Sequence, residues 1–163
     1  MKRIFCLATL LFLLLSLCAC GEKKEYRDDL SCGELIDRAT EQIPVDMGYK
    51  SLGGEHIKYN FNDTELDDDH SFSVSASSSD INEVGIFHAA DSEATEELSA
   101  LAEEYLKSYR EEKEAFIASY APKELEKIKN AEVRVFGNYV AYAILSADDG
   151  RIFFDTVEKL LRP

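Results

Sequence analysis

The chain has 163 residues, and its 32 acidic side chains outnumber 18 basic ones, which gives a formal net charge of −14. Such an acidic balance argues against a nucleic-acid-binding protein, because phosphate recognition needs clustered lysine and arginine. It also disfavours a domain that lies flat on anionic lipid headgroups, so we attribute the charge to solubility.

Residues 1–19 have the pattern of an export signal. Lys2 and Arg3 give a positive start, and a largely apolar run from Ile4 to Leu17 follows. A helix of that length spans about 21 Å, which is shorter than the hydrocarbon core of a bilayer at about 30 Å. A positive start before a short apolar segment is typical of a signal peptide rather than a permanent anchor.

The end of this segment, Leu17-Cys18-Ala19-Cys20-Gly21, resembles a lipobox, in which an aliphatic residue and two small residues precede a cysteine. The aliphatic and second small positions match, whereas Cys18 stands where alanine, serine or threonine is usual. We therefore predict that residues 1–19 are a lipoprotein signal peptide and that Cys20 is lipidated. One lipid chain holds a protein only marginally, so the diacylglyceryl group, with chains such as palmitate, makes the anchoring durable.

Cleavage of 19 residues from 163 would leave 144, and the loss of two basic residues would change the formal charge from −14 to −16. That length is enough for one domain with a genuine core. Of the four cysteines, Cys6 and Cys18 leave with the signal and Cys20 carries lipid. Cys32 alone remains, so we expect no internal disulfide and a half-buried packing role for this thiol.

The tether and the first helix come next along the chain. Residues 20–30 are mostly charged and lack apolar periodicity, which indicates a lipidated tether before a single domain at 31–163. Ser31-Cys32-Gly33-Glu34 fits a capping box and predicts the start of a helix that ends before Pro44. After this helix, residues 57–61 favour a short strand or an extended loop.

A strand pair and the longest helix follow. Apolar residues alternate with serines over 71–77, which predicts a strand with one apolar face and one face in water. A turn leads to a second strand at 83–88. Asp91 or Ser92 then caps a long two-faced helix, on whose apolar stripe we place Tyr105, Tyr109, Phe116 and, near its end, Tyr120.

The C-terminal part predicts a second hairpin and a last helix. Gly137-Asn138 joins strand-like runs at 133–136 and 139–145, and both residues tolerate the positive φ of a tight turn. Asp148 or Asp149 is expected to cap the final helix. The fold class is therefore α+β, with an antiparallel sheet of about four strands built from two hairpins, packed against a long amphipathic helix and two shorter helices.

Several segments together resemble a known family. They are the lipobox, the serine-rich strand, Glu83-Val84-Gly85-Ile86-Phe87, Ser119-Tyr120-Ala121-Pro122 and the Gly137-Asn138-Tyr139 hairpin. Over roughly residues 30–162 the chain is similar to the Firmicutes lipoproteins that carry domain of unknown function 4358. The resemblance implies a Gram-positive source and the outer face of the cytoplasmic membrane. It implies no activity, so no catalytic residue follows from it.

The acidic run before the first strand is the one candidate for a cation site. Hard cations such as Ca²⁺ prefer carboxylate and carbonyl oxygens, which makes Asp63, Glu65, Asp67 and Asp69 candidate ligands. The run is not an EF-hand loop, because Asp68 occupies the glycine position. A solvated acidic loop is the commoner interpretation of such a cluster.

The sequence contains no recognisable catalytic motif. The serines of 71–79 lack a G-x-S-x-G or S-x-x-K context, so we interpret them as the wet face of a strand. His56, His70 and His88 are too far apart for a local metal motif. We accordingly expect no catalytic residue and no cofactor.

Three functional hypotheses follow. The first is a non-enzymatic, membrane-anchored module that binds an envelope protein or a small ligand outside the cytoplasmic membrane. The second is a module that depends on Ca²⁺ or binds a cationic ligand, and the third is an envelope enzyme whose site is assembled from distant residues. A cleft in which His56, His88 and several carboxylates converge would favour the enzyme.

Overall fold

The structure is a computed structural model that describes residues 25–45, 47–61 and 69–163. In chain order the elements are α2 (Cys32–Thr40), β1 (Tyr49–Ser51), α3 (Gly54–Asn60), β2 (His70–Ser75), β3 (Glu83–His88), α4 (Ser92–Tyr120), the 3₁₀ helix η2 (Pro122–Glu124), α5 (Leu125–Lys129), β4 (Glu132–Phe136), β5 (Tyr139–Ile144) and α6 (Ala147–Leu161). The strands form one antiparallel sheet in the order β1-β2-β3-β5-β4. The predicted α+β class is confirmed, with five strands instead of about four.

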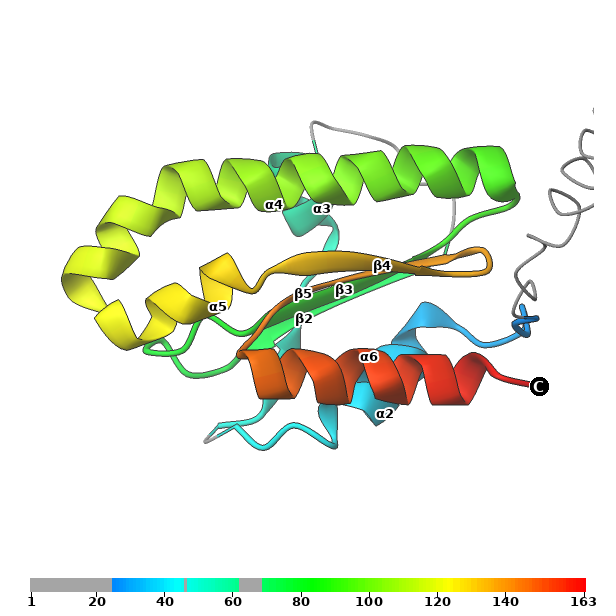
Figure 1. Ribbon diagram of the computed structural model, residues 1–163, viewed down its shortest axis with the longest axis horizontal. Coiled ribbons are helices and arrows are strands. Elements are labelled where there is room, and N and C mark those ends of the chain that lie inside the picture. The colour runs from blue at the N-terminus through cyan, green and yellow to red at the C-terminus, as the bar shows by residue number, and fades with distance from the viewer. Residues whose placement is uncertain (1–24, 46, 62–68) are drawn as a thin grey trace, which may run out of the picture.

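Helices cover both faces of the sheet (Figure 1). The long helix α4 lies over one face, and α2 and α6 lie over the other. Alternation along β3 and β5 supplies both cores, because neighbouring residues in a strand point to opposite faces. Val84 and Ile86 belong to the core under α2 and α6, whereas Phe87 and Tyr142 belong to the core under α4.

The segment before the acidic run differs from the prediction. Residues 57–61 are neither a strand nor an extended loop, because Gly54–Asn60 forms the helix α3. The extra strand β1 pairs with β2 at the edge of the sheet. A helix of seven residues makes barely two turns, too few to show an apolar period, and isolated helices of this length are not stable. Its end is held by Phe61, whose side chain is fully buried in the core under α4.

The serine side of β2 is not in water, and that prediction was wrong. Ser73 and Ser75 are only 4% and 5% exposed. Helix α2 contacts β2 and covers this side of the strand. The small hydroxyl side chains allow the helix to lie close, and the Ser75 hydroxyl oxygen accepts a hydrogen bond from the Ser77 amide at 3.2 Å.

Helix α4 is longer than the sheet that it covers. Its 29 residues span about 44 Å, and its C-terminal end extends past the strands (Figure 1). Leu98, Ala102 and Tyr105 are buried as expected. Phe116 and Tyr120 are 61% and 77% exposed, because no strand lies beneath them, so their predicted packing role was wrong.

Capping and turn residues close in sequence set most of the boundaries of the helices and strands. The Asp91 carboxylate caps α4 by accepting hydrogen bonds from two backbone amides, and Gly137 adopts a φ of 62° in the β4–β5 turn, both as predicted. The cap of α6 is Ser146, not Asp148 or Asp149. The Ser146 hydroxyl oxygen accepts a hydrogen bond from the Asp149 amide at 3.2 Å, so the serine satisfies the free amide at the helix start and the two aspartates lie inside the first turn.

Gly85, in the middle of β3, allows two aromatic rings to lie directly against the strand backbone. It lies opposite Phe72 of β2 and Tyr142 of β5 in the register of the sheet. A Cβ atom at this position would overlap the Tyr142 ring and approach the Phe72 ring within 2.6 Å. Glycine inside a strand marks such places, where another group approaches the backbone closely.

We therefore expect Gly85→Ala to destabilise the fold by about 1–3 kcal/mol, because overpacking displaces the Tyr142 ring. The matched control is Gly150→Ala in α6, where a Cβ would meet nothing within 4 Å. That change should be neutral or stabilise by up to about 1 kcal/mol. Thermal unfolding of the full-length chain in mild detergent, followed by circular dichroism, measures both. Equal stability of the two variants would contradict this close packing of the rings on Gly85.

Candidate functional site

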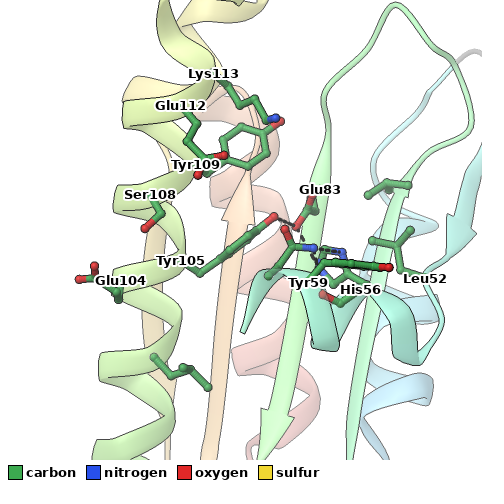
Figure 2. Close-up of a pocket in the computed structure, with 13 residues that line it drawn as sticks. Leu52, His56, Tyr59, Glu83, Glu104, Tyr105, Ser108, Tyr109, Glu112 and Lys113 are labelled. Atoms are coloured by element: carbon green, nitrogen blue, oxygen red, sulfur yellow. Dashed lines mark hydrogen bonds and ion pairs between the residues drawn. The ribbon is translucent and has the colours of Figure 1, made fainter. Parts of the chain in front are cut away.

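A cleft of about 430 Å³ lies between α3 and α4, with Val74 of β2 and Glu83 of β3 in its floor (Figure 2). Its other walls and rim are formed by Leu52, His56, Tyr59, Asn60, Leu101, Glu104, Tyr105, Ser108, Tyr109, Glu112 and Lys113. A second, more open depression of about 470 Å³ lies beside α2. The charged residues that line it, Asp37 and Glu41, are exposed, so it offers no buried charge.

Glu83 is the buried charged group of the first cleft. It is 6% exposed and stands at the start of β3, on the face under α4. Its Oε1 atom accepts hydrogen bonds from the hydroxyls of Tyr105 at 2.6 Å and Tyr142 at 2.8 Å. Burial raises the pKa of the Glu83 carboxyl, and these two hydrogen bonds offset part of the rise. The hydrogen bonds and the ion pair of Glu83 within the described residues all involve Oε1, and Oε2 keeps some contact with the cleft and its solvent, since it is not among the fully buried unpartnered atoms.

His56 approaches the same oxygen from α3. Its Nε2 lies 3.5 Å from Glu83 Oε1 and 3.5 Å from the Tyr142 hydroxyl. One turn later, the Asn60 amide nitrogen lies 2.9 Å from both the His56 carbonyl oxygen and the His56 Nδ1. Since the amide must present N–H to the carbonyl, Nδ1 is an acceptor and the ring proton is on Nε2, facing Glu83. Burial lowers the His56 pKa to about 4, so the ring is neutral at pH 7.

Aromatic side chains surround the His56 ring and hold it at the floor of the cleft. The His56 ring lies 5.0 Å from Phe72 and 5.8 Å from Phe61, centroid to centroid. Tyr142 reaches Glu83 by crossing Gly85, which lies two residues further along the same strand face. We call Glu83, His56, Tyr105 and Tyr142 the carboxylate cluster. Its members come from β3, α3, α4 and β5, so all four elements meet at one carboxylate oxygen.

The other histidines do not join the carboxylate cluster. His88 is at the opposite end of β3, where its ring stacks on Tyr139 at 4.4 Å. Its Nε2 lies 2.7 Å from an oxygen of Asp28. The ring of His70, at the start of β2, contacts Phe72 at 5.7 Å. Of the residues whose convergence would favour an enzyme, His56 contacts one buried carboxylate, Glu83, and His88 lies apart from both, beside Asp28.

The predicted cation ligands are described only in part. Asp63, Glu65 and Asp67 lie outside the described residues, as does the lipidation site Cys20. The Asp69 carboxylate accepts a hydrogen bond from the Cys32 amide at 2.6 Å, at the start of α2. Within the described ranges, no three side chains of histidine, cysteine, aspartate or glutamate are placed to hold a metal ion.

Cys32 and the residues before it are held by the fold. The Cys32 side chain is fully buried, deeper than the half-buried position expected, and its thiol donates to the Asp69 carbonyl oxygen at 3.3 Å. Burial raises the thiol pKa, so the nucleophilic thiolate is disfavoured. In the segment assigned to the tether, the Tyr26 ring contacts Phe136 at 5.9 Å, and the Arg27 amide donates to Leu161 at 2.8 Å.

Fold and site define a layered α+β domain with a polar cleft that is closed at its floor by a buried carboxylate. The chain belongs to the family described as a domain of unknown function (DUF4358), whose pattern matches residues 46–145. That range contains the whole carboxylate cluster. No curated protein and no solved structure gave a significant match. None of the described helices combines the length and apolarity needed to span a bilayer.

The pKa of His56 predicts an acid sensitivity of the fold. An unfolded chain binds a proton to this ring near its ordinary pKa of 6.5, but the folded chain does so only near 4. The free energy of unfolding therefore decreases as the pH falls from 6.5 towards 4. The full shift corresponds to about 3 kcal/mol, and solvent at the mouth of the cleft reduces it to about 1–2 kcal/mol.

The measurement is the difference in unfolding free energy between the wild type and His56→Asn, followed from pH 7 to pH 4. A difference is needed because the raised pKa of Glu83 acts in the opposite sense, favouring the folded state at lower pH. We expect the advantage of the wild type to shrink on acidification. An advantage that stays constant or grows would contradict a neutral, buried His56.

Proposed function

We propose that this chain is a lipoprotein of a Gram-positive bacterium, anchored through Cys20 at the outer face of the cytoplasmic membrane, and that it is a binding module whose cleft receives a small ligand. The anchor rests on the charged start, the short apolar run and the lipobox of residues 1–21. The binding role rests on one observation: a buried carboxylate at the floor of a cleft, with one oxygen to which none of the described residues donates a hydrogen bond.

Binding is favoured over catalysis by the arrangement of the cleft. Ser108 is the serine that lines it, and in Figure 2 its side chain points away from Glu83 and His56. A nucleophilic serine would need a base within hydrogen-bond reach. The His56 proton instead faces Glu83, and its other ring nitrogen faces Asn60, so both ring nitrogens already have protein neighbours.

The cleft also has the general character of a small-molecule site. Such sites commonly have volumes of about 300–1,000 Å³ and combine aromatic or apolar walls with a few oriented polar groups. Here the polar groups converge on Glu83, and the rings of Tyr105 and Tyr109 stand beside it on α4. An envelope protein partner remains the alternative ligand, in which case an inserted side chain would occupy the same cleft.

The anchor is tested by expressing the full-length chain in a Gram-positive host supplied with labelled palmitate. We expect label in the wild type, and in Cys18→Ala, which replaces the neighbouring cysteine. Cys20→Ala should carry no label and should keep its signal peptide, because the peptidase cuts only before the modified residue. Label on Cys20→Ala, or its loss from Cys18→Ala, would show that the lipobox is wrongly assigned.

The cleft is tested by fluorescence, because the chain contains no tryptophan. Tyr109→Trp places a single indole in the cleft, and the matched control Tyr120→Trp places one on the same helix outside it, where the side chain is 77% exposed. A panel of cationic, neutral and anionic aromatic fragments is titrated into both full-length variants. We expect a saturable change for at least one fragment in Tyr109→Trp alone. No change with any fragment, or equal changes in both variants, would count against the cleft as a binding site.

A further inference from the structure

We infer that the cleft takes a ligand with a protonated primary amine, whose ammonium group donates a hydrogen bond to Oε2 of Glu83. This inference rests on the proposed binding function and names its ligand class. The three nearest polar side chains, Tyr105, Tyr142 and His56, all approach the other oxygen, Oε1. The cluster therefore fixes the carboxylate but leaves one acceptor for a donor that the described residues do not supply.

The vacant acceptor calls for a positively charged donor. Burial raises the pKa of the Glu83 carboxyl, so its charged form is unfavourable unless hydrogen bonds and a counter-charge stabilise it. A neutral donor would satisfy the hydrogen bond but not the charge, whereas an ammonium group satisfies both, and charge-assisted hydrogen bonds are roughly twice as strong as neutral ones. His56 supplies no counter-charge at neutral pH, because its ring is uncharged there.

The charges around the cleft also favour a cationic ligand. Glu104 and Glu112 on α4 add two carboxylates to Glu83, and among the described residues of the lining Lys113 is the one lysine or arginine. Figure 2 shows Lys113 beside Tyr109 near the upper end of the cleft, away from Glu83. The lining therefore carries more negative than positive charge, with Glu83 at the floor and the exposed Glu104 and Glu112 on α4. An anionic ligand would have to approach Glu83 against this charge.

The walls suit the organic part of such a ligand. Tyr59, Tyr105 and Tyr109 present aromatic rings, whose faces attract ammonium groups, and Leu52 and Leu101 present apolar surface. A hydrated divalent metal ion fits less well, because it needs several converging oxygen ligands. In the described ranges no group of three suitable side chains provides them. The cation is therefore an amine with an aromatic or short aliphatic body.

The test compares three probes of nearly equal shape: phenethylamine, its neutral analogue 2-phenylethanol, and the anionic 3-phenylpropionate. Each is titrated into the full-length Tyr109→Trp chain in detergent at pH 7, where the amine is protonated. We expect the amine to bind at least about tenfold more tightly than the alcohol, which is the effect of one hydrogen bond to a charged group. The acid should bind most weakly.

Two further substitutions test whether this preference comes from the Glu83 side chain. Glu83→Gln, made in the same background, should abolish the advantage of the amine over the alcohol. Glu111→Gln removes the same charge from an exposed position of α4 outside the cleft and should keep it. Circular dichroism checks that each variant is folded. If Glu83→Gln does not fold, the comparison of amine, alcohol and acid on the unsubstituted cluster decides alone.

The outcomes separate the two proposals. Equal binding of amine and alcohol, or tighter binding of the acid, in the cleft would overturn the amine inference and leave the binding function standing. An amine preference that persists in a folded Glu83→Gln would also overturn it. If none of the probes changes the fluorescence, and the wider fragment panel fails as well, the binding function itself falls.

Discussion

The structure depends on one buried carboxylate. Placing the charge of Glu83 under α4 is unfavourable unless donors surround it, and the donors come from three other elements. Tyr105 fixes the rotation of α4 about its axis, Tyr142 requires a strand neighbour without a side chain, and His56 holds α3 against the sheet. Because all of them meet at Oε1, the carboxylate sets the relative positions of elements that are far apart in the sequence.

Features that arise from local chemistry could be predicted from the sequence. The Asp91 cap, the Gly137 turn and the alternating strands require only neighbours in the chain, and the structure confirms them. Burial of the serine face of β2 depends on α2, which begins about forty residues earlier, and the exposure of Phe116 depends on where the sheet ends. A hydrophobic period cannot report either fact, because it describes one element at a time.

The site was missed for a related reason. Glu83 is one of 32 acidic residues, and nothing in its immediate neighbours shows that its side chain turns inward. The useful signal was the combination of a glutamate at the start of an apolar strand with a glycine two residues later. A glycine inside a strand indicates close approach of another group, and here that group is the ring that hydrogen-bonds the glutamate. His56 was named only with His88, as residues whose convergence with carboxylates would favour an enzyme, and the sequence did not single out Glu83 as its partner.

The overall charge and the cleft act at different ranges. A net charge of −14 raises the local concentration of cations, but at physiological salt its influence decays over about 8 Å. It therefore assists the approach of an amine without distinguishing one amine from another. Discrimination has to arise at Oε2 of Glu83, in the partly desolvated cleft, because a charge pair is stronger there than at the open surface. The acidic surface and the buried carboxylate thus make separate contributions, and only the second depends on the fold.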